Sequence, residues 1–355
     1  MKIKSIQLKN FRNHLNTAVT LSGGINVLVG KNAQGKTNLL EAIYLTCVGR
    51  GWRARQDKEL VNFDKETAYI KTKVEKRFGN IDIEIQLSTT KKKSAKINKV
   101  PISKVSELLG TINCVFFSPD ELRLIKEAPA DRRRFMDIDI SQIDKNYFYA
   151  LLKYNKILAQ RNALLKNVPR GTNEDIKRSL DIWDAQLVEA GNIIVQRRLR
   201  FIEDIKKHLS PIHAKLSGTR EEIVIEYEHH SDLEAKLKES REKDLARGFT
   251  SVGPHRDDIL ITISGKDVRK FASQGQQRSA ALSLKLCQLE IFKEATNEAP
   301  VVLFDDVFSE LDEIRQNNLL TLLEGSQAVL TATHPPEPTC CTLFHVSNGQ
   351  IDNRQ

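Results

Sequence analysis

The sequence has few of the features that would assign it to a membrane, secreted or zinc-binding class. It contains five cysteines among 355 residues and no C-x-x-C pair, so neither a zinc site nor a disulfide framework is expected. No uninterrupted apolar run approaches the length that crosses a bilayer, and the first residues mix lysines with apolar residues, unlike a signal peptide. Internal repeats and low-complexity segments are absent as well. We therefore expect a globular cytoplasmic protein that makes no membrane contact.

Positive charge is unevenly distributed along the chain. Residues 50–104 hold 15 Lys and Arg against 7 Asp and Glu, which accounts for nearly all of the net charge of +9. A local basic surface attracts polyanions, although charge runs also occur as solvated faces without a partner. The basic stretch favours DNA binding when it is taken together with the G-x-x-x-x-G-K-[ST] motif at residues 30–37, described next. The expected contacts are Lys91, Lys92, Lys93, Lys96 and Lys99.

A phosphate-binding loop is predicted between a short apolar run at 25–29 and a segment of helical spacing from residue 38. Residues 30–37 match G-x-x-x-x-G-K-[ST] at every fixed position. The glycines let successive backbone N–H groups point into one concavity at a helix N-terminus. Lys36 would reach the β- and γ-phosphates of ATP, and Thr37 would hold Mg²⁺. The alternative is a glycine turn that matches by chance. The expected nucleotide contacts are Gly30, Lys31, Asn32, Ala33, Gln34, Gly35, Lys36 and Thr37.

A second part of the site is predicted where the apolar run 301–304 ends in two carboxylates. Ligands bind at the carboxyl ends of strands in open α/β sheets, so Asp305 is expected to coordinate Mg²⁺. Asp306 would orient or deprotonate the attacking water as a catalytic residue beside Lys36. A strand that meets an acidic turn is the plainer interpretation. Because 269 residues separate Lys36 from Asp305, the sequence predicts a head split by a long insertion.

Residues 271–278 contain the pattern S-x-G-Q, in Ser273, Gly275 and Gln276, ahead of a helix predicted at 279–294. The pattern matches the signature of ABC-type ATPases, which meets the γ-phosphate held by a second subunit, so an ATP-dependent homodimer is expected. A polar turn with a helix cap is the alternative. His334 follows an apolar strand at 329–333, in the place of the ABC switch histidine, although a lone histidine is often incidental.

The order of the predicted strands and helices along the chain indicates an α/β fold with a helical insertion. Strands are expected within 1–29, in a hairpin over 68–87 that turns at Gly79–Asn80, and at 114–117, 223–227 and 259–263. Long helices are expected at 145–166 and 174–209, separated at 169–171. We predict head residues at 1–136 and 249–355 and a helical lobe at 137–248. One buried face of the second helix is expected to contain Ile182, Leu187, Ala190, Ile194, Phe201, Ile205 and Leu209.

With these motifs together, the chain resembles the RecF family of SMC-like ABC ATPases over essentially its whole length. The resemblance rests on the phosphate loop, on the signature and on five further segments. These segments are residues 8–13, 117–120, 129–135, 160–166 and 253–258. One departure is that Ser118 and Pro119 stand where the glutamine of a Q-loop would be expected.

The resemblance implies an ABC/SMC-type ATPase head of mixed sheets with flanking helices, and a helical second lobe in place of a long coiled coil. It also implies a slow ATPase that binds ATP with Mg²⁺ and whose hydrolysis serves as a conformational switch. Arg12 would contact the nucleotide phosphates. The implied role is a dimeric clamp on single-stranded or gapped DNA that helps RecO and RecR load recombinase and supports the SOS response. The alternatives are an SMC-like DNA tether, a transporter nucleotide-binding subunit, or a kinase or metabolic NTPase using the same loop.

Overall fold

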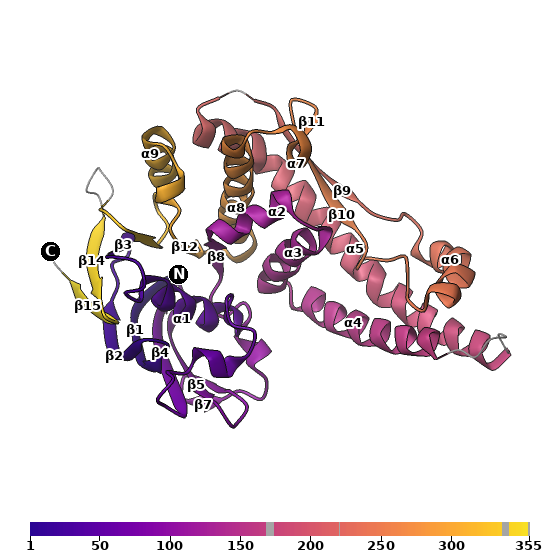
Figure 1. Ribbon diagram of the computed structural model, residues 1–355, viewed down its shortest axis with the longest axis horizontal. Helices are drawn as coiled ribbons and strands as arrows, with labels where there is room; N and C mark the ends of the chain where they lie inside the picture. Colours follow the sequence, from indigo (N-terminus) through magenta and orange to yellow (C-terminus); the bar gives the residue numbers. More distant parts are fainter. Residues whose placement is uncertain (168–173, 220, 336–340, 354–355) are drawn as a thin grey trace. The chain divides into compact units, whose positions relative to one another are not determined.

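The computed structural model describes residues 1–167, 174–219, 221–335 and 341–353 (Figure 1). The chain divides into two compact units, each assembled from separate stretches of sequence. The first, here called the head unit, comprises Met1–Leu122, Pro211–Arg220 and Gly275–Gln355. The second, here called the helical unit, comprises Arg123–Ser210 and Glu221–Gln274.

The head unit contains an antiparallel sheet with the strand order β2-β1-β4-β5-β6-β7. Alternate residues of its long strands are buried, as expected of a sheet with one face in the core and one in solvent. The strands are β1 Lys2–Phe11, β2 His14–Thr20, β4 Thr67–Lys76, β5 Gly79–Ser88, β6 Ser94–Ile97 and β7 Val100–Pro101.

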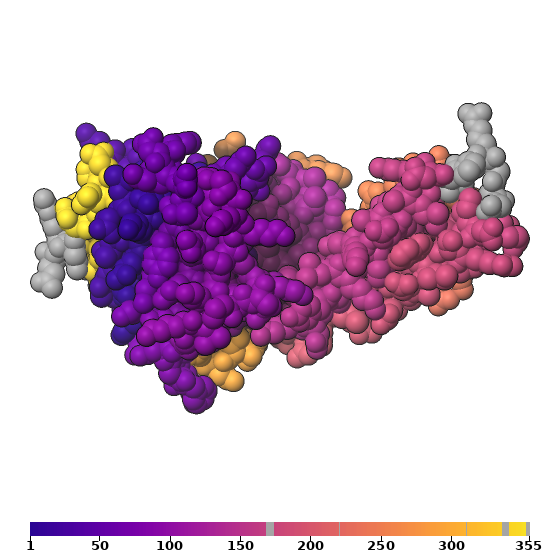
Figure 2. Space-filling model, turned by 90° about the horizontal axis from the view of Figure 1, so that it is seen from below, coloured from indigo at the N-terminus to yellow at the C-terminus, as the bar shows by residue number. Residues whose placement is uncertain are grey.

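A second sheet in the head unit has the order β15-β14-β3-β13-β12-β8 and is parallel except for β15. Its central strands are short apolar runs buried on both faces, as is typical of parallel sheets. The yellow C-terminal strands lie beside the indigo N-terminal residues in both views (Figures 1 and 2). The strands are β3 Ile25–Val29, β8 Cys114–Phe117, β12 Val301–Phe304, β13 Ala328–Ala332, β14 Thr342–Ser347 and β15 Gln350–Asn353.

Helix α1, Lys36–Val48, packs against both sheets of the head unit, and for this reason it is buried on nearly every side. It ends at Gly49, which adopts a left-handed conformation with φ 81° and returns its N–H to the carbonyl of Leu45. The other helices of this unit are α8 Gln274–Thr296, α9 Glu313–Leu322 and the short η1 Asp57–Leu60, η2 Val105–Leu108, η3 Pro119–Leu122 and η4 Phe308–Glu310.

The helical unit combines helices with a small antiparallel sheet of order β11-β10-β9. Its interior holds two fully buried arginines, and each meets a carboxylate: Arg161 contacts Asp184 and Asp244, and Arg198 contacts Asp137. The elements are α2 Arg123–Lys126, α3 Pro129–Ile143, α4 Lys145–Lys166, α5 Glu174–Ser217, β9 Ile223–Glu228, α6 Leu233–Arg247, β10 Asp258–Ile263, β11 Lys266–Asp267 and α7 Val268–Phe271. The last turns of α5 belong to the head unit.

Several boundaries differ from those expected from the sequence. The helical unit begins at Arg123 and extends to Gln274, beyond both ends of the predicted lobe at 137–248. The β4–β5 hairpin turns at Arg77 and Phe78, because Gly79 already pairs with Lys76. The predicted separator at 169–171 lies outside the described residues.

Helix α5 was predicted at 174–209 but extends to Ser217, past Pro211. Six of the seven residues expected on its buried face are buried, but Ile182 is 59% exposed. Leu180, two positions earlier, is fully buried instead. Among the described residues no helix is both long and apolar enough to cross a membrane.

Candidate functional site

The loop between β3 and α1 is held in shape by its neighbours. A side chain at Gly30 would overlap the carbonyl oxygen of Val346, so only glycine fits there. Gly35 precedes α1 with φ 115°, a conformation that L-residues rarely adopt. The carbonyl of Gln34 accepts hydrogen bonds from the Asn13 side chain at 3.1 Å and from the Gly349 N–H at 2.9 Å. The β1–β2 turn and the β14–β15 turn therefore clamp the loop from two sides.

Lys36 folds back over this loop. Its Nζ donates to the carbonyl of Gly30 and, at 2.9 Å, to the carbonyl of Lys31. Burial lowers the pKa of the Lys36 ammonium, while the nearby carboxylates of Asp306 and Asp305 act in the opposite direction. The ammonium thus lies in the loop concavity before any phosphate enters it.

Asp305 and Thr37 meet at the carboxyl end of the parallel sheet. The Thr37 hydroxyl donates to Oδ1 of Asp305 at 2.8 Å, and the Thr331 hydroxyl, from β13, donates to the same oxygen at 2.8 Å. Burial raises the pKa of the Asp305 carboxyl, although these two hydrogen bonds oppose the shift. The next residue, Asp306, has φ 50° and donates its N–H to Thr331 Oγ1 at 2.8 Å. Helix α1, the end of β12 and strand β13, which are far apart in the sequence, thus supply one polar cluster.

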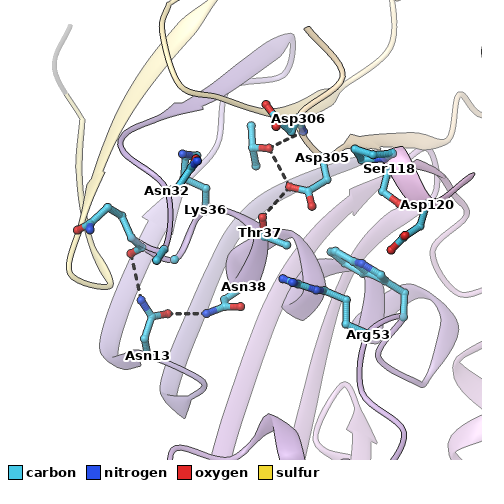
Figure 3. A pocket seen from close by; sticks show the side chains of 16 residues that line it. Asn13, Asn32, Lys36, Thr37, Asn38, Arg53, Ser118, Asp120, Asp305 and Asp306 are labelled. Carbon is cyan, nitrogen blue, oxygen red and sulfur yellow. Dashed lines mark hydrogen bonds between the residues drawn. The ribbon is translucent and has the colours of Figure 1, made fainter. Parts of the chain in front are cut away.

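These groups open into a pocket of about 640 Å³ that is lined by 16 residues of the head unit (Figure 3). Of the predicted nucleotide and metal contacts, Asn32 to Thr37, Asp305 and Asp306 all line it. Gly30 and Lys31 take part through the carbonyls that receive Lys36. The loop and the acidic strand end, predicted separately from sequence, are therefore brought together by the fold.

Other predicted contacts lie outside the pocket lining, namely Arg12, Ser273, Gly275, Gln276 and His334. The Arg12 guanidinium donates through Nε at 3.1 Å and Nη2 at 2.9 Å to Glu41, whose side chain is fully buried in α1. The second Glu41 oxygen accepts the N–H of Arg53 at 3.1 Å. Arg12 is thus committed to a buried carboxylate, whereas Arg53 lines the pocket.

The signature residues lie at the start of α8. The predicted helix at 279–294 in fact begins at Gln274, so Gly275 and Gln276 are in its first turn and Ser273 precedes it, exposed. The division between the two units falls between Gln274 and Gly275. His334 is exposed two residues beyond β13. The roles predicted for these residues remain predictions.

Sequence reasoning missed part of the pocket wall: Asn13, Asn38, Trp52, Arg53, Ser118, Asp120 and Thr331. Asn38 donates to Asn13 at 2.8 Å and so joins α1 to the β1–β2 turn. Trp52 packs on Tyr44 and Phe116, with ring centroids 5.5 and 4.3 Å away. Three of these positions, Asn13, Ser118 and Asp120, lie in segments that carry the family resemblance, but no local pattern placed them at the pocket.

The donor set at Asp305 suits a hard cation. Thr37 offers a hydroxyl and Asp305 a carboxylate, and oxygen ligands of this kind, supplemented by water and phosphate oxygens, are what Mg²⁺ takes in nucleotide sites. Among the described residues, no group of three or more His, Cys, Asp and Glu side chains gathers to form a metal site made of protein ligands alone. These residues therefore fit a Mg²⁺ that arrives with a nucleotide.

The five lysines predicted to bind DNA are not equivalent. Lys91 and Lys92 lie exposed between β5 and β6, Lys96 lies exposed on β6, and Lys99 lies exposed in the β6–β7 turn. Lys93 points elsewhere: its Nζ donates to the Gly49 carbonyl at 2.7 Å and to Asp57 at 2.9 Å. Lys93 therefore ties this loop to the end of α1, and four lysines are left facing solvent.

The mixed sheet, the phosphate loop and the acidic strand end define a head fold of the SMC type. The model of the RecF/RecN/SMC N-terminal domain family matches residues 2–336. A solved SMC head bound to the C-terminal winged-helix domain of ScpA has a TM-score of 0.60 at 17% identity, with 99% of this chain and 96% of that chain covered. At that identity the likeness shows the fold alone.

Proteins of higher sequence identity identify the family within this fold. The DNA replication and repair protein RecF of Agathobacter rectalis is 43% identical over 99% of both chains, and that of Lachnoclostridium phytofermentans is 43% identical over 94% of this chain and 93% of that protein. A solved structure titled as the recombination mediator protein RecF with ATPrS in the RecFOR pathway has a TM-score of 0.92 at 39% identity, covering 100% of this chain and 98% of that one. The chain belongs to the RecF family.

Proposed function

We propose that this chain binds ATP with Mg²⁺ in the head-unit pocket and uses slow hydrolysis to switch a dimer that holds DNA. The observation that carries the proposal is the convergence of Thr37, Asp305 and Thr331 beside a loop already occupied by the Lys36 ammonium. A second solved relative, titled as RecF with ATP, has a TM-score of 0.90 at 39% identity and supports the choice of nucleotide.

Each side chain has a distinct task in this proposal. The loop N–H groups and the N-terminus of α1 bind phosphate oxygens, and Lys36 exchanges loop carbonyls for the β- and γ-phosphates. Thr37 and Asp305 hold Mg²⁺, which when bound neutralises charge on the phosphates. Asp306 orients the attacking water and accepts its proton. His334, at the place of the ABC switch histidine, is proposed as a further catalytic residue.

The dimer is proposed from the signature. Ser273 directly precedes the 23-residue helix α8, and Gly275 and Gln276 lie in its first turn, where the helix N-terminus favours an anion. None of the three lines the chain's own pocket. We propose that they meet the γ-phosphate held by a second copy. DNA, single-stranded or gapped, is the proposed polyanion for the exposed lysines, and RecO- and RecR-type proteins are the proposed partners in recombinase loading and the SOS response.

DNA binding measured across salt, with and without ATP and Mg²⁺, tests the proposal. Gapped, single-stranded and duplex substrates should be compared for the unmodified chain and for Lys36→Ala. We expect log K to fall linearly with log salt, and ATP to strengthen binding to single-stranded or gapped DNA only in the unmodified chain. Lys36→Ala should lose ATP affinity, because Lys36 is the only lysine among the described residues that line the pocket.

Two results would count against the proposal. ATP affinity unchanged in Lys36→Ala would refute the phosphate-loop assignment. DNA binding that is absent, or independent of salt, would refute the DNA clamp and favour an ATPase of another class, such as a transporter subunit.

A further inference from the structure

The hydroxyl of Ser118 is an anomaly in the pocket wall. Ser118 is 3% exposed and lines the pocket, and its Oγ has no hydrogen-bond partner among the described residues. Buried hydroxyls are nearly always hydrogen-bonded, because an unpaired polar group away from water is costly. An exception at the wall of a ligand site indicates a partner that comes with the ligand.

The neighbouring strands place Ser118 beside the residue proposed to hold the metal. Strands β8 and β12 pair in parallel with Phe117 opposite Phe304, and the N–H of Asp305 donates to the carbonyl of Phe117 at 2.9 Å. Ser118 and Asp305 therefore follow two paired strands at equivalent positions, and neighbouring strands lie roughly 4.8 Å apart in the hydrogen-bonding direction. Figure 3 shows both side chains at this edge, with Thr37 below Asp305.

The local structure leaves the hydroxyl available. A serine that precedes a helical turn usually accepts a backbone N–H through its side chain. Here the N–H of Glu121 goes to the carbonyl of Ser118 instead, at 2.9 Å. Serine has one side-chain torsion with three staggered positions, so the hydroxyl can turn toward the pocket without moving the backbone.

We propose that the Ser118 hydroxyl hydrogen-bonds a water of the Mg²⁺ shell once Thr37 and Asp305 hold the ion with a nucleotide, an inference that rests on the proposed function. Mg²⁺ keeps several of its waters in nucleotide sites, and each bound water needs an acceptor. Ser118 directly follows β8, the strand that pairs with β12, and Asp305 directly follows β12. It is a positioning residue, since it acts on the metal's water and not on the phosphate itself.

The test measures the thermal stabilisation of the full chain by ATP in the presence of EDTA, and then as Mg²⁺ is titrated. In Ser118→Ala we expect the stabilisation by ATP without metal to be unchanged and the Mg²⁺ concentration for half-maximal additional stabilisation to rise about 10–100-fold. The ligand-free protein should melt at the same temperature or higher, because the unpaired hydroxyl is gone. Electron paramagnetic resonance of Mn²⁺ measures metal binding and release without turnover. It should show the same shift in metal affinity for Ser118→Ala.

A matched control is Ser251→Ala. The Ser251 hydroxyl is also buried without a partner among the described residues, but it belongs to the helical unit and does not line the pocket. Its Mg²⁺ midpoint should equal that of the unmodified chain. If Ser118→Ala fails to fold, Ser118→Cys keeps the volume while replacing the hydroxyl with a weakly hydrogen-bonding thiol, and should show the same loss.

The outcomes separate this inference from the proposed function. A Mg²⁺ midpoint in Ser118→Ala equal to that of the unmodified chain overturns the inference alone. Equal loss of stabilisation with and without metal overturns it as well, because the effect would then lie in the nucleotide pocket as a whole. An unmodified chain that ATP does not stabilise under any condition overturns the proposed function, and this inference with it.

Discussion

At the scale of single residues, the two carboxylates that end β12 have different environments. Asp305 accepts hydrogen bonds from Thr37 and Thr331, yet burial still raises the pKa of its carboxyl. Asp306 has a left-handed backbone, with φ 50°, which non-glycine residues adopt rarely and often at functional sites. Asp305 is therefore fixed by two hydroxyl donors, whereas Asp306 is distinguished by its backbone conformation.

Asp305→Asn should stabilise the ligand-free protein and weaken metal binding. When folding raises the pKa of a carboxyl, the protein becomes less stable as pH rises above the pKa of that group in the unfolded chain. The reason is that the ionised carboxylate is less favourable in the folded state. Asparagine keeps the oxygen that accepts from both threonines but carries no charge. We expect a higher Tm at pH 8 than for the unmodified chain, a smaller difference at pH 4, and a loss of Mg²⁺ affinity of about tenfold or more.

Thermal melts across pH and a Mg²⁺ titration with ATP present would measure both effects. A variant that melts lower at pH 8, with Mg²⁺ affinity intact, would contradict the environment described for Asp305.

At the scale of elements, the loop between β5 and β6 shows how a charge run divides into two roles. Lys91, Lys92, Lys96 and Lys99 are exposed, while Lys93 reaches Asp57 and the C-terminal end of α1. A cation beside the last carbonyls of a helix is stabilising, and Lys93 donates to Gly49 just there. One lysine in the run thus serves the fold, and the other four form the candidate DNA surface.

Replacing Lys91, Lys92, Lys96 and Lys99 by glutamine should weaken DNA binding alike for all sequences. The slope of log K against log salt should fall by about one for each phosphate contact that is lost. Lys93→Gln is the matched control, and we expect it to lower the Tm while leaving the slope unchanged. A slope that stays constant in the fourfold variant would show that these lysines are only a solvated face.

A second element-scale feature lies in the helical unit, where a histidine links α4 to the loop after α6. Tyr154 contacts Nδ1 of His255 at 2.7 Å, and Nε2 contacts the carbonyl of Thr250 at 3.1 Å. This arrangement fits a neutral ring that accepts from the tyrosine and donates to the carbonyl. Burial lowers the pKa of His255 to about 4.

The helical unit should therefore lose stability in acid as His255 takes up a proton. The pKa of His255 is lower in the folded protein than its unfolded value of about 6.5. Its contribution to the free energy of unfolding is therefore full above about pH 6.5 and is lost as pH falls toward 4, on the order of 3 kcal/mol in total. His255→Gln can make both hydrogen bonds without titrating, so its unfolding free energy should depend less on pH over this range. Chemical denaturation at each pH measures the unfolding free energy of both proteins. If the two depend equally on pH, the acid sensitivity belongs to other groups.

At the scale of the whole molecule, the proposed site is divided between two copies of the chain. Each copy offers a phosphate loop in its pocket and a signature at the start of α8, and the signature does not line the pocket of its own chain. One triphosphate can bridge two such anion sites. The stability of the dimer then depends on how long ATP remains uncleaved.

Ser273→Arg and Asp306→Asn should act on this dimer in opposite directions. The first should leave ATP bound to each monomer but block pairing, because it places bulk and charge at the proposed seam. The second should allow pairing while hydrolysis slows by about two to four orders of magnitude, since the proton acceptor is lost. Sedimentation with ATP and a phosphate-release assay measure the two effects.

Mixing Lys36→Ala with Ser273→Arg provides a stricter test, because that heterodimer keeps one complete composite site. Some ATP-dependent dimer should return on mixing. If Ser273→Arg alone pairs with ATP like the unmodified chain, the shared-site model is wrong.

The sequence by itself determined the parts of this protein that depend on local order. The phosphate loop, its strand and its helix could be predicted because the glycines, Lys36 and the apolar runs are contiguous and each pattern has one local solution. The strand that precedes Asp305 and the long helices α4 and α5 followed for the same reason, whereas α8 begins at Gln274, earlier than its pattern predicted. The RecF family was recognisable from such contiguous motifs as well.

Only the tertiary structure decided which distant residues share a surface. Thr331 and Ser118 stand beside Asp305 because β13 and β8 flank β12, and no local periodicity encodes that neighbourhood. Arg12 meets Glu41 of α1, while its contact with the phosphates stays a prediction. Lys93 meets Asp57 within an otherwise exposed run. Ile182 fits the helical period of α5 yet is exposed, since periodicity identifies a face while the neighbouring elements determine how far it is covered. These outcomes depend on contacts between segments remote in sequence, which form only when the chain has folded.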